Sequence, residues 1–155
     1  MIRLCKKEEY GILIEVLRDS FSSGSLDKQL EDKFGKVNGF DWWERKSEDI
    51  MKQVKDFPEG VFVEELDGRI VGYITTFIDK KFSVGRIWTI TVLPAYQGKG
   101  IGARLIKHAL DMFKKNKLKL ARIEVIQENP KACELYKKLG FEPFSSQVNL
   151  AMKIK

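Results

Sequence analysis

The sequence is poor in the residues that build disulfide scaffolds and metal centres. It has two cysteines, Cys5 and Cys133, and one histidine, His108, among its 155 residues. Two cysteines are too few for a disulfide framework or a cysteine-built zinc site, and a single histidine adds little to such a site. We therefore expect a reduced chain with no protein-bound metal.

Long apolar runs and secretion signals are also missing. No apolar stretch approaches the roughly 20 residues of a membrane-spanning helix, and the first residues lack the basic and apolar segments of a signal peptide. A composition of 43% hydrophobic and 32% charged residues is globular and excludes a wholly disordered or collagen-like chain. The length suits one domain, so we expect a soluble, cytoplasmic, single domain over residues 1–155 with no membrane partner.

Charge is unevenly distributed along the chain. The net charge is +6, but residues 1–80 carry 13 basic and 17 acidic side chains, whereas residues 81–155 carry 15 and 5. An anionic partner is therefore better placed against the second half and a cationic one against the first. A solvated surface explains the pattern equally well.

Periodicity and turn signals predict one α/β domain with a mixed sheet. Asp67-Gly68 predicts a hairpin, Asp41 with Glu44 predicts a capping box, and Asn129 predicts a helix N-cap. Residues 22–39 show no clear period, and Ser22 to Ser25 interrupt the first helix. The predicted helices cover residues 10–21, 42–55, 101–113 and 130–139, and the predicted strands cover residues 2–5, 61–66, 69–78, 86–93, 120–126, 141–144 and 148–154.

The segment between the predicted strand at 86–93 and the helix that begins at Ile101 is rich in glycine. Gly98, Gly100 and Gly102 allow a ligand to approach the backbone closely, at an entropy cost that a simple turn would not require. Free N–H groups at the helix start, with Lys99 and Arg104, favour an anion. A phosphate or pyrophosphate is the expected ligand.

Two familiar phosphate-binding loops can be compared with this segment. A Walker loop fails, because Leu93 stands where its first glycine is needed and Gly100 follows the lysine. A dinucleotide fingerprint fits Gly98, Gly100 and Ala103. However, residues 94–97 lengthen the turn, and the remaining elements are too few for a six-stranded nucleotide fold. Dinucleotide binding stays an alternative.

Two blocks resemble the GNAT superfamily of acetyl-CoA-dependent N-acetyltransferases, and the resemblance covers residues 60–155 well. It implies a mixed α/β fold with a mostly antiparallel sheet of six to seven strands, about four flanking helices and a parallel crossover at the cofactor cleft. The blocks are Gln97-Gly98-Lys99-Gly100-Ile101-Gly102 and Asn129-Pro130-Lys131-Ala132-Cys133-Glu134-Leu135-Tyr136-Lys137-Lys138-Leu139-Gly140-Phe141.

The resemblance implies acetyl-CoA as the cosubstrate, with its pyrophosphate on the amides of the glycine loop. The N–H of Val92 is the expected partner of the thioester carbonyl. The implied cofactor-binding residues are Ile90, Thr91, Val92, Gln97, Gly98, Lys99, Gly100, Ile101, Gly102, Ala103, Asn129 and Tyr136.

Two side chains are candidate catalytic residues. An alkyl ammonium with a pKa of about 10 must lose a proton before it attacks a thioester, and Glu124, expected in mid-strand and partly buried, is the candidate base through water. Ribosomal-protein-type N-terminal acetyltransferases are similar in the spacing of Glu124, Asn129 and Tyr136. Tyr136 is the candidate proton donor to the leaving thiolate. A solvent-facing role for Glu124 and a packing role for Tyr136 are the alternatives.

One departure from the family bears on the base. Histone-type members carry a glutamate on the strand before the glycine loop, where this sequence has Thr89 and Thr91. A base on that strand is therefore absent, and Glu124 acting through ordered water becomes the main candidate for the role. We assign Cys133 to packing, and His108 to packing or the surface.

The expected function is acetyl transfer from acetyl-CoA to a primary amine, such as a protein N-terminus or a small amine, by direct attack in a ternary complex. A homodimer is a candidate assembly. A non-catalytic acyl-CoA sensor is the alternative from another class. A nucleic-acid partner is not expected, because the basic half lacks an RNA-binding aromatic signature, a zinc finger or a basic heptad.

Overall fold

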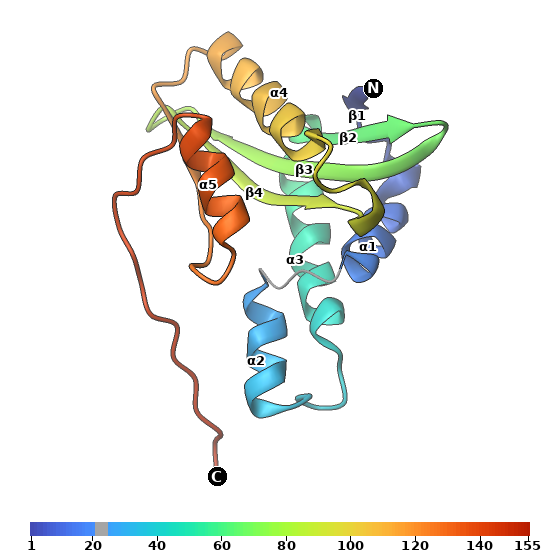
Figure 1. Ribbon diagram of the computed structural model, residues 1–155, viewed down its shortest axis with the longest axis vertical. Coiled ribbons are helices and arrows are strands. Elements are labelled where there is room, and N and C mark those ends of the chain that lie inside the picture. The colour runs from blue at the N-terminus through green and yellow to red at the C-terminus, as the bar shows by residue number, and fades with distance from the viewer. Residues whose placement is uncertain (21–24) are drawn as a thin grey trace. The chain divides into compact units, whose positions relative to one another are not determined.

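The computed structural model describes residues 1–20 and 25–155 (Figure 1). The chain forms two compact units, Met1–Phe21 with Lys46–Glu124 and Ser22–Arg45 with Val125–Lys155. The predicted end of the first helix at Phe21 and most of its serine-rich interruption lie outside the described residues. No helix in the described part of the chain has the length and apolarity to cross a bilayer.

The first unit is built on a five-stranded sheet in the order β1-β2-β3-β4-β5. Neighbouring strands are antiparallel except for β4 and β5, which are parallel. Asp67 and Gly68 have φ values of 50° and 75°, so the predicted hairpin turn is confirmed. The strands are β1 (Ile2–Leu4), β2 (Val61–Leu66), β3 (Arg69–Asp79), β4 (Val84–Val92) and β5 (Leu120–Ile123).

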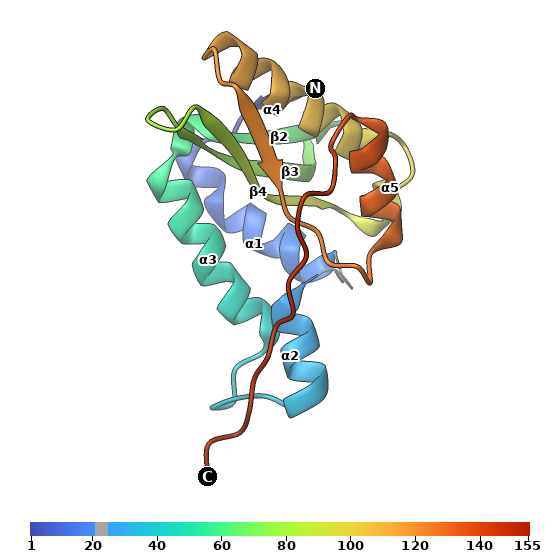
Figure 2. The same ribbon diagram turned by 90° about the vertical axis from the view of Figure 1, so that its left-hand side faces the viewer.

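Helices cover both faces of this sheet. Helix α4 (Ile101–Lys115) lies on one face, and α1 (Tyr10–Asp19) and most of α3 (Trp42–Asp56) lie on the other (Figures 1 and 2). Each helix turns an apolar stripe to the strands, as its periodicity predicts. The buried apolar residues of these three helices are Leu13, Val16, Leu17, Trp42, Ile50, Val54, Ile101, Leu105, Ile106, Ala109 and Phe113.

The second unit contains α2 (Leu26–Phe34) and α5 (Pro130–Lys138). No helix was predicted over α2 from the sequence, although Leu26, Leu30 and Phe34 recur every four residues along it, and none of its residues is buried. The start of α5 is as predicted, because the Asn129 side chain accepts a hydrogen bond from the Ala132 N–H at 3.3 Å. Its end is also as predicted, since Gly140 follows with a φ of 101°.

The C-terminal segment differs from the expectation. Residues 141–155 form no strand, so the sheet has five strands rather than six or seven, while the mixed α/β class is confirmed. Val148, Leu150, Met152 and Ile154 alternate along the segment and are 76–89% exposed. The predicted alternation is present, but within the described residues no neighbouring strand pairs with it.

Candidate functional site

The pairing register of strand β4 with β3 shifts at Trp88. The pairing with β3 runs from Thr75↔Thr89 to Thr76↔Ile87, so Trp88 is an extra residue on β4 and forms a β-bulge. Beyond the bulge, Thr89 faces α3, where its hydroxyl donates to the Gln53 Oε1 atom at 2.9 Å. Nothing in the sequence pattern indicated this bulge.

In the part of the chain that the structure describes, no strand pairs with the outer edge of the second half of β4, which we call its free edge. Strand β5 pairs with β4 only over residues 84–87 and ends at Ile123, three residues earlier than predicted. On the opposite edge, the Leu93 N–H donates to the Val71 carbonyl at 2.9 Å. Because hydrogen-bonded pairs alternate in an antiparallel ladder, Thr91 also faces β3, while the backbone groups of Ile90 and Val92 face the free edge.

The predicted strand residues therefore divide into two kinds. Ile90 and Val92 present their backbone N–H and C=O groups to the free edge, whereas the backbone groups of Thr91 face β3. The Gln97 side chain donates from Nε2 to the Val92 carbonyl at 3.0 Å. This bond secures the loop to the strand and leaves the Val92 N–H directed at the free edge.

The glycine loop continues directly from this edge. Gly98 and Gly100 have φ values of 74° and 78°, a region of backbone conformation that favours glycine. Gly100 is also the N-cap of α4 and provides no side chain to cap it. The first helical bond joins the Arg104 N–H to the Gly100 carbonyl at 3.0 Å. The N–H groups of residues 101–103 precede it and have no intrahelical acceptor.

The Arg104 guanidinium, which was predicted to favour an anion at the glycine loop, is bonded to other groups of the protein. Its Nη2 atom lies 2.7 Å from the Glu64 Oε1 atom, and its Nη1 atom donates to the Lys99 carbonyl at 3.2 Å. The Glu64 side chain is only 4% exposed, so this carboxylate is a buried partner on β2. The guanidinium therefore ties the glycine loop to the sheet.

The Glu64–Arg104 pair was not predicted from the sequence. A usable signal existed, because strand alternation places Glu64 on the same face of β2 as the buried Phe62. An acidic residue at such a position needs a cation. Lys99 keeps its exposed ammonium, which lies 5.2 Å from the centre of the Tyr96 ring.

The environment of Glu124 differs from the prediction. It follows the last residue of β5 instead of lying in mid-strand, and its side chain is 73% exposed rather than partly buried. Its Oε1 atom accepts a hydrogen bond from Arg86 at 3.0 Å, and Arg122 lies 3.9 Å away. Early termination of β5 therefore places this carboxylate in water.

Tyr136 and Cys133 lie on α5, the helix of the second unit whose N-terminus is capped by Asn129. The Tyr136 ring packs edge-on against Phe141 and is 8% exposed. Burial, with a smaller contribution from Cys133, raises the pKa of Tyr136 to about 12, so the phenol is protonated at neutral pH. The Cys133 thiol lies 3.8 Å from the Ile126 carbonyl and is partly buried.

Several other residues singled out from the sequence have structural contacts. His108 packs its ring edge-on against Phe62 at 4.4 Å between ring centres. The Asp41 N–H donates to the Glu44 Oε2 atom at 2.7 Å, as the capping box predicted. In the described ranges, no group of three or more His, Cys, Asp or Glu side chains is arranged to hold a metal.

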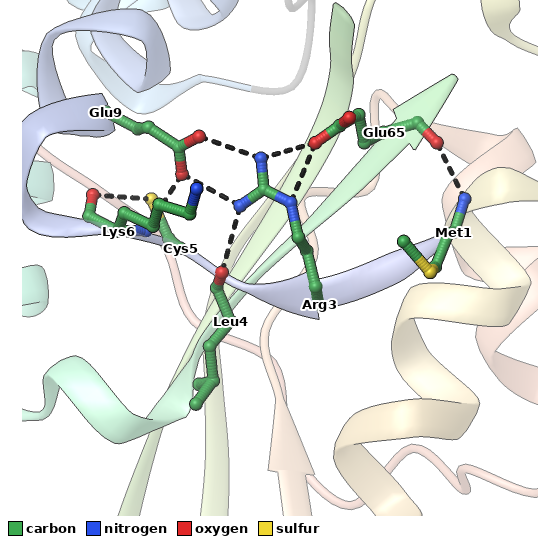
Figure 3. A network of polar contacts seen from close by, with 7 residues as sticks. All are labelled: Met1, Arg3, Leu4, Cys5, Lys6, Glu9 and Glu65. Carbon is green, nitrogen blue, oxygen red and sulfur yellow. Dashed lines mark hydrogen bonds and ion pairs between the residues drawn. The ribbon is translucent and has the colours of Figure 1, made fainter. Parts of the chain in front are cut away.

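A polar network lies at the β1 edge of this sheet, opposite β5 (Figure 3). The Arg3 guanidinium on β1 bonds both the Glu9 carboxylate, at 2.7 and 2.9 Å, and the Glu65 carboxylate on β2. The hydrogen bonds from Arg3, aided by one from Lys6, lower the pKa of Glu9 to about 2. A cavity of about 480 Å³ opens beside this network and reaches Leu93, the residue after β4.

Comparisons with known proteins agree on one family. The profile of the acetyltransferase (GNAT) family matches residues 13–141. An uncharacterized N-acetyltransferase of Methanocaldococcus jannaschii is 32% identical over 87% of this chain and 64% of its own length. An N-alpha-acetyltransferase of Sulfurisphaera tokodaii is 33% identical over 60% of this chain and 62% of its own length. This chain therefore matches somewhat less than two thirds of either relative.

Solved structures show the same fold. The PaiA N-acetyltransferase of Thermoplasma acidophilum, crystallised in complex with coenzyme A, superposes with a TM-score of 0.75 and 21% identity. That superposition covers 95% of this chain and 92% of the other. A Pyrococcus horikoshii protein, PH1933, gives a TM-score of 0.73 and 27% identity over 96% and 92% of the two chains.

Proposed function

The chain belongs to the acetyltransferase (GNAT) family, and from this premise we propose that it transfers an acetyl group from acetyl-CoA to a primary amine. The amine attacks the thioester directly while both substrates are bound. The observation that carries the proposal is the free edge of β4 beyond Trp88, which runs without a break into the glycine loop. Its donors are backbone N–H groups, and they suit a ligand with both amide and phosphate groups.

The residues present fit acetyl-CoA. Amides of the glycine loop and of residues 101–103 would hold the diphosphate, with help from the helix dipole and the exposed Lys99. The edge groups of Ile90 and Val92 would pair with the amides of the pantetheine arm as a neighbouring strand does. The Val92 N–H would stabilise the negative charge that develops on the thioester oxygen during attack.

Two proton transfers accompany the reaction. The attacking amine must lose a proton, and we assign its acceptance to the Glu124 carboxylate through ordered water, because that side chain is exposed. Coenzyme A leaves as a thiolate whose thiol has a pKa of about 8.5. We assign the stabilisation of this thiolate to Tyr136. Because the pKa of its phenol is about 12, Tyr136 donates a hydrogen bond rather than transferring its proton completely.

A protein N-terminus is the acceptor to test first. The spacing of Glu124, Asn129 and Tyr136 supports it, and so does the likeness to an N-alpha-acetyltransferase. Small amines form the second class. The test has two parts: calorimetry with acetyl-CoA, and release of free coenzyme A thiol with peptides, polyamines and aminoglycosides as acceptors.

We expect saturable binding of acetyl-CoA and transfer to at least one class of amine. Binding without transfer to any acceptor would favour the acyl-CoA sensor, and binding of NAD without acetyl-CoA would favour the dinucleotide alternative. The transfer rate of Glu124→Gln decides between the carboxylate and water alone as the base.

A further inference from the structure

Gln53 is a polar residue on the buried face of α3. It lies three residues after Ile50 and directly before Val54, and both of these residues are fully buried. The Gln53 Oε1 atom accepts two hydrogen bonds, one from the Thr75 hydroxyl at 2.6 Å and one from the Thr89 hydroxyl at 2.9 Å. An amide oxygen has two lone pairs, so both are used. One atom of α3 therefore bonds both β3 and β4.

The two threonines form the strand pair that borders the bulge. Thr75 lies opposite Thr89, and the register shifts between Thr75 and Thr76, which leaves Trp88 as the extra residue on β4. Thr75 and Thr89 are 0% and 8% exposed, and a buried hydroxyl that loses its partner destabilises the fold. Because successive side chains alternate between the faces of a strand, a slip of β4 by one residue would take the Thr89 hydroxyl away from Gln53. The amide oxygen therefore favours one register of β4.

The two strands differ in how strongly they depend on this contact. Thr75 of β3 is paired on both sides, with Val61 of β2 and with Thr89 of β4. Beyond Trp88, β4 is paired with β3 alone in the part of the chain that the structure describes. A segment with one neighbouring strand has fewer backbone hydrogen bonds to hold it. The bond from Gln53 therefore contributes more to the position of β4 than to that of β3.

The register of β4 beyond the bulge decides which backbone groups reach the free edge. The Thr91 N–H faces β3 and the Val92 N–H faces the free edge, and a slip by one residue would exchange these two directions. We propose, on the basis of the function proposed above, that Gln53 is a positioning residue for acetyl transfer. Through its bond with Thr89 it fixes the register of β4, and with it the direction of the Val92 N–H.

Two matched substitutions test which strand carries the effect. Thr89→Val and Thr75→Val each remove one hydroxyl from the same Gln53 oxygen. Thr89→Val should lower kcat by about 10–100-fold, as a small misplacement of reacting groups does, and should change the KM for acetyl-CoA less than kcat. Thr75→Val should keep the wild-type kcat, because β3 is held from both sides. Equal kcat losses in the two variants, or a wild-type kcat in Thr89→Val, would overturn the proposal.

A double-mutant cycle tests whether Gln53 acts through Thr89. Gln53→Met removes the accepting oxygen from an unbranched side chain, and Lys52→Met is its control at the exposed neighbouring position. Gln53→Met should reproduce the kcat of Thr89→Val, and the double variant should lose no more than either single one, because the two residues act as a unit. Lys52→Met should keep the wild-type kcat. Additive losses in the double variant would contradict the role assigned to Gln53.

Amide hydrogen exchange tests the register independently of acetyl transfer. The Leu93 N–H, which donates to the Val71 carbonyl at 2.9 Å, should exchange about tenfold faster in Gln53→Met than in the wild type. The amides of residues 84–87 should keep their rates, since strands pair with both edges of β4 there. An equal change along all of β4, or none at Leu93, would overturn the proposal. A wild type that transfers no acetyl group to any amine would overturn the proposed function instead.

Discussion

Strand β4 is bordered by two strands along residues 84–87 and by one along residues 88–92. In the first half, neighbouring strands pair with both edges, and Gly85 lies so close to the Phe113 ring that no Cβ would fit. In the second half, one edge is open and the side chains shift face at Trp88. Backbone groups stabilise the sheet where they are paired, and they become available to a ligand where a neighbouring strand stops.

Removing one N–H from the open edge should have the largest effect. Val92→Pro deletes a donor that neither β3 nor β5 uses, so the variant should fold while kcat falls by about 10²–10³-fold, as for an oxyanion donor. Thr91→Pro is the matched variant. It deletes an N–H that faces β3 and should lower the free energy of unfolding by about 1–3 kcal/mol. Steady-state kinetics and thermal melts of both variants test the contrast, and unchanged turnover of Val92→Pro would refute the role of the edge.

Tyr136→Phe should separate the chemical step from binding at the open edge. It keeps the ring and removes the hydroxyl, so kcat should fall by about 100-fold, as for the loss of one hydrogen-bond donor to a developing negative charge, with no change in the affinity for acetyl-CoA. Kinetics and calorimetry measure the two quantities. Normal turnover would assign Tyr136 to packing.

Gly100→Ala should weaken the binding of acetyl-CoA. A Cβ at a φ of 78° costs about 1–2 kcal/mol, which corresponds to a KM increase of about tenfold if the loop relaxes to avoid it. Gly39 provides the control, because it has a φ of 78° and nothing within 4 Å of the added Cβ. Gly39→Ala should lose stability and keep its KM. Equal KM changes in the two variants would point to a general effect of strain.

Glu64→Gln should have a smaller effect on the same loop. The amide keeps the shape of the carboxylate but removes the charge that holds Arg104, so the free energy of unfolding should fall by about 1–3 kcal/mol. The KM for acetyl-CoA should rise less than in Gly100→Ala. Glu65→Gln, at the next position, changes a carboxylate that bonds Arg3 instead. A KM rise in Glu65→Gln equal to that in Glu64→Gln would remove the special role of the Glu64–Arg104 pair.

The network around Arg3 should affect stability alone, and its contribution should be lost in acid. Hydrogen bonds from Arg3 lower the pKa of Glu9 from 4.5 to about 2, so its contribution is complete above pH 4.5 and is lost as the pH falls toward 2. We expect a contribution of about 1 kcal/mol for this partly exposed pair. Urea unfolding of the wild type and Glu9→Gln at pH 7 and pH 3 measures it. The difference between them should shrink at the lower pH, and a constant difference would contradict the assignment.

The glycine loop and its free backbone amides were predictable from the sequence. The environment of the candidate side chains, such as Glu124, was less predictable. Gly98 and Gly100 are residues that readily adopt positive φ values. Gly100 also offers no side chain to cap α4, so the first amides of that helix are left free. These are local properties. The burial of Glu124 depends on where β5 ends, which the residues of β5 do not specify, and the expectation of a partly buried base was wrong.

Helix α2 escaped prediction because its apolar pattern is short. Leu26, Leu30 and Phe34 recur every four residues, but the stripe has only three members and none of them is buried. Residues 148–154 show the opposite case, since their alternation predicted a strand that the single chain does not form. A strand requires a partner edge as well as a pattern, and no sequence pattern states where that edge is.

By itself the sequence determined β1 to β5 and the helices α1, α3, α4 and α5, the hairpin at Asp67-Gly68, the cap at Asn129 and the glycine loop, because each depends on residues close together in the chain. The tertiary structure decided the bulge at Trp88, the free edge of β4 and the ion pair between Glu64 and Arg104. These features join residues up to 40 positions apart. Their energies depend on which groups are left without a partner once the chain is packed.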